Sequence, residues 1–483
     1  MGIWGFNFSK VLLLSTESWH GFWDFQIDTF DACMALGIIA VVFLLSNSLR
    51  RKVGFIRKSL LPTAMISGLI ILILKSFGLF DLLVDVQKTD ALMEAITYHA
   101  LGLGVIAVTL KSGQKKSSSR KREIFDAGLI TVNTYLLQAI IGVVFTVLLS
   151  LTIQRGLFPA AGFILPLGYG QGSGQALNFG RIFENTYGFE GGASFGLTVA
   201  TIGFLVACLL GVGHIVVMRR RGKIELLEEK PEFVSTEVIA SPNEVPVTET
   251  VDRMTIQVIL ILLVYFITFL FMYGIENMPL GNFGTNTLKP MIWGFNFLIG
   301  SIFGSLLKVV FKYLKKYNLM TRDYPNDYLL NRISGFMFDI MIIAGTAAIN
   351  IQVLKSLILP LVLICLVGAI LTYFYVRKLS YLVFPGYPEE AFLSLFGMLT
   401  GTTSTGMILL REVDPKFETP AANNLVYQSF YAIALGFPLF FLLGVAPKGL
   451  TETLVSLGIV ILMFVLFNVI LFRNRIFKKK AKA

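Results

Sequence analysis

Two stretches of the chain place small polar residues among glycines inside apolar sequence. The first is GYGQGSGQALNFG at 168–180, and the second is GMLTGTTSTG at 397–406. Glycine lets the backbone leave helical geometry, so freed carbonyls and nearby hydroxyls can replace the water shell of Na⁺, while a helix that starts there favours an anion. The side chains expected to bind an ion or solute are Gln171, Ser173, Asn178, Thr402, Thr403, Ser404 and Thr405.

The two stretches occupy matching positions in the two halves of the chain. Residues 170–173 lie 231 positions before residues 401–404, and Arg181 lies 230 positions before Arg411. A single glycine-rich segment would be explained by close helix packing in a membrane. Two interrupted segments at matched positions, each with a polar cluster, instead favour the paired broken helices of a secondary transporter.

Asp339 is the clearest carboxylate at membrane depth, in the apolar run GFMFDIMIIAGTAAIN. A charged group in lipid is costly and usually faces a cavity or a partner. We expect Asp339 to bind Na⁺ or a substrate amine, with a structural bond to a neighbouring side chain or backbone group as the alternative. The Na⁺ site is expected near Gly170, Ser173, Asp339, Gly401, Thr403 and Ser404.

Further polar residues are candidates for lining the cavity. They are Asn133, Gln138, Thr198, Arg411 and Gln428. Thr198 and Gln428 share the offset of 230, while Asn133 and Gln138 could equally bond neighbouring helices. Arg411 could hold a substrate carboxylate in a bidentate fork, or it could anchor a segment at the membrane surface through an i, i+3 pair with Asp414. Arg181 and Glu184 form the corresponding pair in the first half.

Composition limits the class of protein. Of the 483 residues, 55% are hydrophobic and only 15% are charged, against about 25% charged in soluble domains. The net charge of +11 comes from basic residues at the ends of apolar segments, which predicts membrane topology rather than nucleic-acid binding. The three cysteines lack metal-ligand spacing. No Walker-type loop or catalytic constellation is visible, so we do not expect an enzyme.

Eleven apolar stretches can span a bilayer as helices, which satisfy their own backbone hydrogen bonds. They are 27–48, 59–75, 90–110, 126–153, 192–217, 254–274, 287–309, 333–353, 355–376, 423–444 and 450–472. Lysine and arginine gather in alternate loops, and the positive-inside rule then predicts an N-terminus outside and a C-terminus in the cytoplasm.

The spans predict an all-α membrane protein built from two inverted-topology repeats, each with a re-entrant hairpin. Each half holds five spans, and this odd number turns the second copy upside down. The expected units are an interfacial N-terminal segment (1–26), a first repeat (27–217, hairpin about 156–188), a cytoplasmic linker (218–253), a second repeat (254–444, hairpin about 384–417) and an extra C-terminal helix with a basic tail (445–483).

The sequence resembles the bacterial sodium/glutamate symporter family. The resemblance rests on the stretches 168–180 and 397–415, and on RRKVGFIRKSLLPTAMISGLI at 50–70, which resembles the family's basic loop and proline-containing second helix. It implies Na⁺-coupled glutamate uptake by a homodimer in the bacterial inner membrane. It also implies a mobile domain that carries the hairpins and moves against a dimerisation scaffold.

Together these observations predict a Na⁺-coupled secondary transporter of a small organic anion, with glutamate or a related acidic amino acid as the leading substrate. Alternating access with two opposed hairpins is the expected mechanism. Expected partners are Na⁺, the substrate, the bilayer and a second copy; no nucleic acid and no cofactor other than Na⁺ are expected. Two alternatives remain: proton coupling through Asp339 or His99, and a membrane solute-binding or sensory subunit that does not transport.

Overall fold

The computed structural model describes residues 29–79, 85–111, 121–222, 250–281, 284–320, 324–415 and 417–480. The expected N-terminal segment 1–26 and most of the linker 218–253 lie outside these residues. The described part is helical and contains no strand, as predicted for an all-α protein.

The described residues of the first half of the chain form eight helices. They are α2 (Thr29–Lys52), α3 (Gly54–Lys58), α4 (Thr63–Ser76), α5 (Val86–Leu110), α6 (Lys121–Leu151), α7 (Ile164–Gln171), α8 (Ser173–Tyr187) and α9 (Gly192–Arg220), with the 3-10 turn η3 (Pro159–Phe163) before α7.

The second half of the chain also contains both long and short helices in its described residues. It comprises α10 (Thr250–Asn277), α12 (Asn296–Lys316), α13 (Asp327–Ala347), α15 (Ile358–Val383), α16 (Pro388–Thr400), α17 (Thr403–Arg411) and α18 (Ala421–Leu442), followed by α19 (Leu450–Lys480). Short helical segments join them: η5 (Gly284–Leu288), α11 (Lys289–Ile292), η6 (Trp293–Phe295), α14 (Ile351–Leu354), η7 (Lys355–Leu357) and η8 (Ala446–Lys448).

Ten helices in the described residues are long and apolar enough to cross a membrane, one fewer than predicted. The predicted span 59–75 is α4, which has only 14 residues. Its helix starts after Pro62, because a residue that precedes proline is kept out of the helical conformation. The predicted span 287–309 is also displaced: α12 begins at Asn296, after the 3-10 turn η6, and runs on to Lys316.

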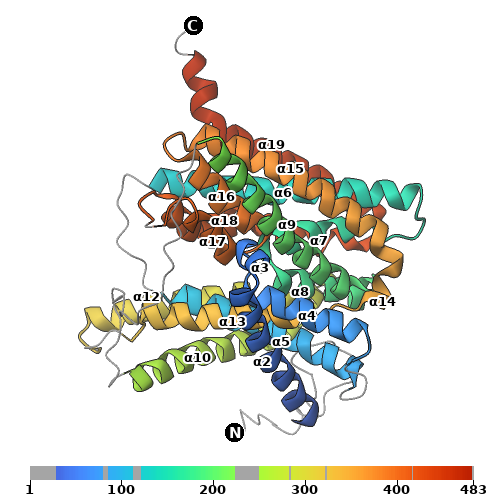
Figure 1. Ribbon diagram of the computed structural model, residues 1–483, viewed down its shortest axis with the longest axis vertical. Helices are drawn as coiled ribbons and strands as arrows, with labels where there is room; N and C mark the ends of the chain where they lie inside the picture. Colours follow the sequence, from blue (N-terminus) through green and yellow to red (C-terminus); the bar gives the residue numbers. More distant parts are fainter. Residues whose placement is uncertain are drawn as a thin grey trace.

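The helices pack into two groups. The first helix group consists of α2, α4, α5, α10, α12 and α13, and the second of α6 to α9 and α15 to α19. Figure 1 shows α5, α10, α12 and α13 in its lower part, with α6, α15 and α19 above. The groups meet where α8 packs on α5 and α13.

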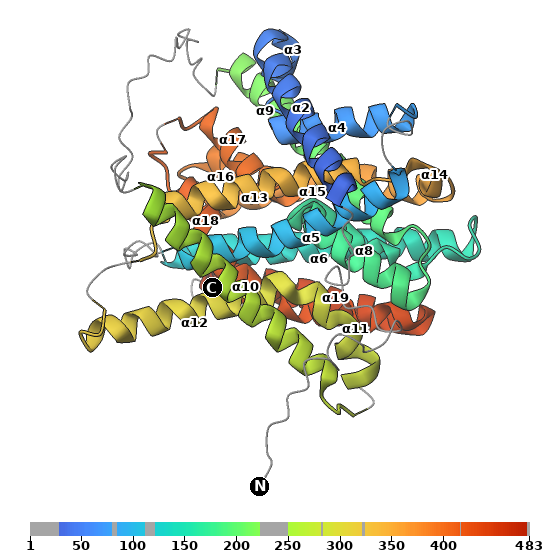
Figure 2. The same cartoon turned by 90° about the horizontal axis from the view of Figure 1, so that it is seen from below.

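The first helix group has a regular internal order. Its neighbours run α2, α4, α13, α5, α12, α10, so that α13 and α5 lie at the centre. Figure 2 shows α2 and α4 at one edge and α10 and α12 at the other. At the centre of the row, α13 from the second half of the chain therefore lies between α4 and α5 from the first half.

Candidate functional site

The first glycine-rich stretch breaks a helix at Gly172. The helix α7 ends at Gln171 and α8 begins at Ser173. Between them Gly172 has φ +85° and ψ −175°, a region of backbone conformation that is open almost only to glycine. The break lies where the sequence predicted it, because glycine alone tolerates this geometry without strain.

The second stretch breaks a helix at Gly401 and Thr402. The Thr402 hydroxyl accepts a hydrogen bond from the backbone N–H of Thr405 over 3.4 Å and so caps the start of α17. The helix α17 folds back along α16, since a Cβ on Gly406 would lie 2.3 Å from the carbonyl oxygen of Ser394. A larger residue at position 406 would push the two helices apart.

The two breaks touch each other. A Cβ added to Gly172 would lie 3.5 Å from Cγ2 of Thr402 and 4.0 Å from Cε of Met341 in α13. The same helix packs against the start of α8, because a Cβ on Gly345 would lie 2.9 Å from Cβ of Ser173. The ends of four short helices and one face of α13 therefore converge, and we call this place the break junction.

Solvent reaches the two breaks unequally. Ser173 and Asn178 are buried on the α8 side, and Gln171 is partly exposed. On the α17 side, Thr403 and Ser404 are exposed, whereas Thr405 is buried. Thus Thr403 and Ser404 at the second break are more exposed than Gln171 and Ser173 at the first break.

Several buried polar atoms beside the first break have no hydrogen-bond partner within the described residues. They are Ser173 Oγ, Gln175 Oε1 and Asn178 Oδ1. Asn178 does donate to the carbonyl of Gly294 over 3.4 Å. Because buried polar groups in proteins are nearly always satisfied, unpartnered oxygens on one short helix can accept bonds from a ligand or coordinate a cation.

Two of the candidate cavity residues hold α16. The Gln138 amide donates to the carbonyl of Leu399 over 2.9 Å and to the Thr372 hydroxyl over 3.1 Å. The Gln428 amide lies 3.1 Å from the sulfur of Met398. Both contacts fall on the last turn of α16, directly before the second break.

The remaining candidates are not brought to the break junction by any contact of the described residues. Thr198 donates to the carbonyl of Ser194 in its own helix. Asn133 is fully buried, and neither atom of its amide has a partner in the described part. The Asp339 side chain is exposed and makes no hydrogen bond or ion pair with described residues.

One of the two predicted i, i+3 ion pairs is wrong. Arg181 does pair with Glu184, over 3.3 Å. Arg411 and Asp414 form no ion pair in the described part of the chain, since the Asp414 carboxylate bonds Glu418 and Thr419 instead. The Arg411 guanidinium instead lies over the ring of Phe417 at 5.5 Å.

The Asp414 side chain forms hydrogen bonds with the residues that follow α17. Its carboxylate accepts hydrogen bonds from the backbone N–H groups of Glu418 and Thr419 and from the Thr419 hydroxyl. Burial raises the pKa of Asp414, but these bonds favour the charged form more strongly and hold the pKa below its usual range.

Sequence reasoning missed two buried charged contacts. Arg181 also forms an ion pair with Glu94 of α5, and this pair joins the two helix groups. Nε2 of His214 in α9 lies 2.8 Å from a carboxylate oxygen of Glu389 in α16. A lone histidine or glutamate in an apolar stretch carries no signal for a partner far away in the chain.

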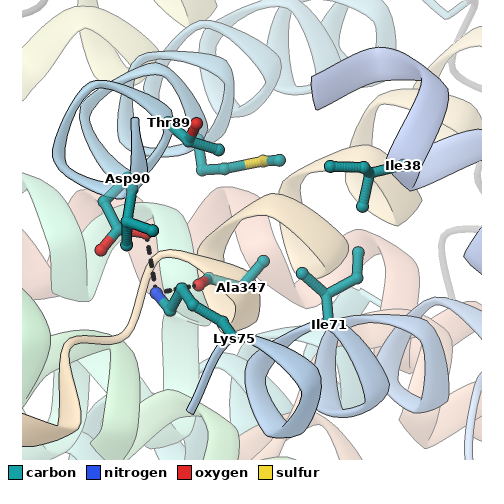
Figure 3. A pocket seen from close by; sticks show the side chains of 8 residues that line it. Ile38, Ile71, Lys75, Thr89, Asp90 and Ala347 are labelled. Atoms are coloured by element: carbon teal, nitrogen blue, oxygen red, sulfur yellow. Dashed lines mark hydrogen bonds and ion pairs between the residues drawn. The ribbon is translucent and has the colours of Figure 1, made fainter. Parts of the chain in front are cut away.

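A pocket on the first helix group lies beside the end of α13. Its walls come from α2, α4, α5 and the last residue of α13 (Figure 3). The Lys75 ammonium lies 2.7 Å from the Asp90 carboxylate and donates to the carbonyl of Ala347 over 2.6 Å. This cation satisfies the end of α13, two residues after Gly345, and so fixes the helix that packs against Ser173.

Comparison with known proteins finds similar sequences. Residues 28–419 match the family model of the sodium/glutamate symporters. The sodium/glutamate symporter of Escherichia coli (strain K12) is 27% identical over 191 residues, which make up 39% of this chain and 44% of the relative. The sodium/glutamate symporter of Shigella flexneri gives the same figures. The matched stretch therefore spans less than half the length of these curated relatives, whereas the family match includes both helix breaks.

Proposed function

Since the chain belongs to the sodium/glutamate symporter family, we propose that it is a Na⁺-coupled symporter of a small organic anion, with glutamate or a related acidic amino acid as substrate. The observation that carries this proposal is the contact between Gly172 and Thr402. It brings two helix ends and two helix starts to one place, the arrangement that can bind a cation and a carboxylate together.

The helix ends supply the cation site. The last carbonyls of a helix lack partners within the helix, and α7 and α16 both end at the break junction. We propose that Na⁺ binds near Gly170, Ser173, Asp339, Gly401, Thr403 and Ser404. Carbonyl and hydroxyl oxygens are suitable ligands because Na⁺ is a hard cation that must exchange its water shell for other oxygens.

The helix starts supply the anion site. The first N–H groups of α8 and α17 are free of helical partners and carry the positive end of the helix dipole. We propose that the substrate carboxylate binds at these starts, beside Gln171, Asn178, Thr402 and Thr405. The proposed cavity-lining residues are Asn133, Gln138, Thr198, Arg411 and Gln428.

Inverted repeats with re-entrant hairpins form part of this proposal. The row of the first helix group supports it, because α4 packs on α13 just as its counterpart α12 packs on α5. The close return of α17 along α16 supports a hairpin in the second half. The proposed opposite entry of the two hairpins requires five crossings in each half, and in the first half the 14-residue helix α4 must supply the fifth.

Alternating access is the proposed mechanism, with the second helix group moving against the first. Its support is the unequal exposure of the breaks: Thr403 and Ser404 are exposed while Ser173 is buried. The inner-membrane location and the homodimer are proposed from the family resemblance.

Proteoliposomes containing the purified full chain test the function. We expect an inward Na⁺ gradient alone to drive accumulation of labelled glutamate, or of another acidic amino acid from a panel, and a proton gradient alone to leave it at background. Accumulation under the proton gradient alone would establish proton coupling. Retention of one solute per protein without counterflow would identify a solute-binding subunit.

Asp339→Asn tests whether this carboxylate is a Na⁺ ligand. As Asp339 is exposed and unpaired within the described residues, the variant should fold normally. A role as Na⁺ ligand predicts a higher Na⁺ concentration for half-maximal uptake. Unchanged Na⁺ dependence would remove Asp339 from the proposed site and leave the rest of the site intact.

A further inference from the structure

Two side chains of α6 each hold the last turn of one broken helix. The Tyr135 hydroxyl donates to the carbonyl of Gly170 over 3.0 Å. The Gln138 amide donates to the carbonyl of Leu399 over 2.9 Å. Each carbonyl lies two residues before the glycine of its break, Gly172 or Gly401.

The spacing of Tyr135 and Gln138 places both donors on one face of α6. Residues three positions apart in a helix lie on the same face, one turn from each other. Tyr135 and Gln138 therefore present two donors along one stripe of α6, and that stripe contacts the ends of α7 and α16. We propose that Tyr135 and Gln138 are positioning residues that set the separation of the two breaks and thereby the affinity for the coupling ion; this inference rests on the proposed Na⁺ symport.

The two carbonyls that accept these hydrogen bonds belong to the helix turns that would coordinate the ion. The last four carbonyls of α7 and α16 lack helical partners, and the side chains of α6 satisfy one in each. The other free carbonyls of these turns are then held at fixed positions relative to a single rigid helix. A cation that binds between two helix ends gains affinity when its ligands are arranged before it arrives.

The packing around both donors leaves little freedom. A Cβ on Gly170 would lie 2.1 Å from Cε1 of Tyr135, so the tyrosine ring packs directly on the backbone of α7. Gln138 is fully buried, and the Thr372 hydroxyl accepts a second bond from the same amide, over 3.1 Å. Loss of either donor leaves a buried carbonyl unsatisfied and frees one helix end to shift.

The inference is tested with Tyr135→Phe and Gln138→Met, which remove the donors and keep the approximate shape. Thr146→Val is the matched control on α6, where the Thr146 hydroxyl donates to the carbonyl of Pro159 over 2.7 Å, away from both breaks. Uptake into proteoliposomes gives the Na⁺ concentration for half-maximal rate and the maximal rate. The increase in Tm on adding Na⁺ to purified protein measures ion binding without transport.

We expect each donor variant to raise the half-saturating Na⁺ concentration about fivefold, the typical effect of one lost hydrogen bond on a binding constant. The maximal rate should change less, and the Na⁺-dependent rise in Tm should shrink. Thr146→Val should keep the wild-type half-saturating Na⁺ concentration, maximal rate and Na⁺-dependent rise in Tm. If Thr146→Val raised the half-saturating Na⁺ concentration as much as the donor variants do, the effect would come from general loosening of α6, and the inference would be overturned.

The two proposals fail in different ways. Wild-type protein without Na⁺-driven uptake contradicts the proposed symport. Wild-type protein with such uptake, together with folded donor variants of unchanged Na⁺ half-saturation, contradicts only the positioning role. If Gln138→Met does not yield folded protein, Tyr135→Phe decides the question alone, because it removes a single oxygen atom.

Discussion

Cγ2 of Thr402 lies 3.5 Å from the place that a Cβ of Gly172 would occupy. Residues 230 positions apart, each at the interruption of a helix, are thus neighbours in the folded protein. Their contact joins the two polar stretches into one candidate site. Gly172 contributes both its unusual backbone conformation and the absence of a side chain.

Gly172→Ala should abolish most Na⁺-driven uptake. Alanine is strained at φ +85° by about 1–3 kcal/mol, and its methyl group would contact Thr402 at the proposed site. We expect at least a tenfold lower uptake rate in protein that still elutes as a folded species. Gly213→Ala in α9 is the matched control, because its Cβ would meet open space. Normal uptake by Gly172→Ala would contradict the assignment of the site.

Ser173→Ala should weaken ligand binding without lowering stability. The buried Ser173 hydroxyl has no partner within the described residues, so its removal costs no hydrogen bond in the unliganded protein. Thermal unfolding should give an equal or higher Tm without ligand and a smaller rise on adding Na⁺ and glutamate. Ser456→Ala in α19 removes another such hydroxyl and should leave both ligand effects intact. Equal behaviour of the two variants would count against a ligand role for Ser173.

Glu94→Gln should destabilise the contact between the two helix groups. The Glu94 carboxylate pairs with Arg181, and its side chain is only 7% exposed. Without it, the partly buried Arg181 guanidinium keeps Glu184 as its one charged partner among the described residues, a situation that costs more than the loss of a surface pair. We expect Tm to fall by roughly a few degrees. Asp126→Asn, which removes an i, i+4 pair to the exposed Arg122, should change Tm much less.

Asp414→Asn should lower stability at neutral pH, and the difference should shrink in acid. A carboxylate accepts the bonds from Glu418 and Thr419, whereas an amide nitrogen cannot. As the pKa of Asp414 is lowered on folding, its contribution is complete above the ordinary aspartate pKa of about 4 and is lost as pH falls through the lowered value. Melting curves at pH 7 and at decreasing pH measure this. Glu418→Gln is the control, and a pH-independent difference for Asp414→Asn would refute the explanation.

The sequence by itself determined the helical class, most of the membrane segments and the positions of both helix breaks. Hydropathy over some twenty residues is a local property, and so is the conformational freedom of Gly172. Local chemistry also explains two errors of prediction: Pro62 shortens α4, and the Asp414 carboxylate bonds Glu418 and Thr419 instead of pairing with Arg411.

Only the tertiary structure decided which groups meet. Tyr135 with Gly170, Gln138 with Leu399 and Arg181 with Glu94 are contacts between separate helices, and no spacing in the sequence specifies them. They depend on how close two backbones approach and on which faces the helices turn to each other. For the same reason the exposed Asp339, the most conspicuous charge in the sequence, is not among the groups that pack at the break junction. Polarity along the chain marked the two stretches, and packing in three dimensions brought them into contact.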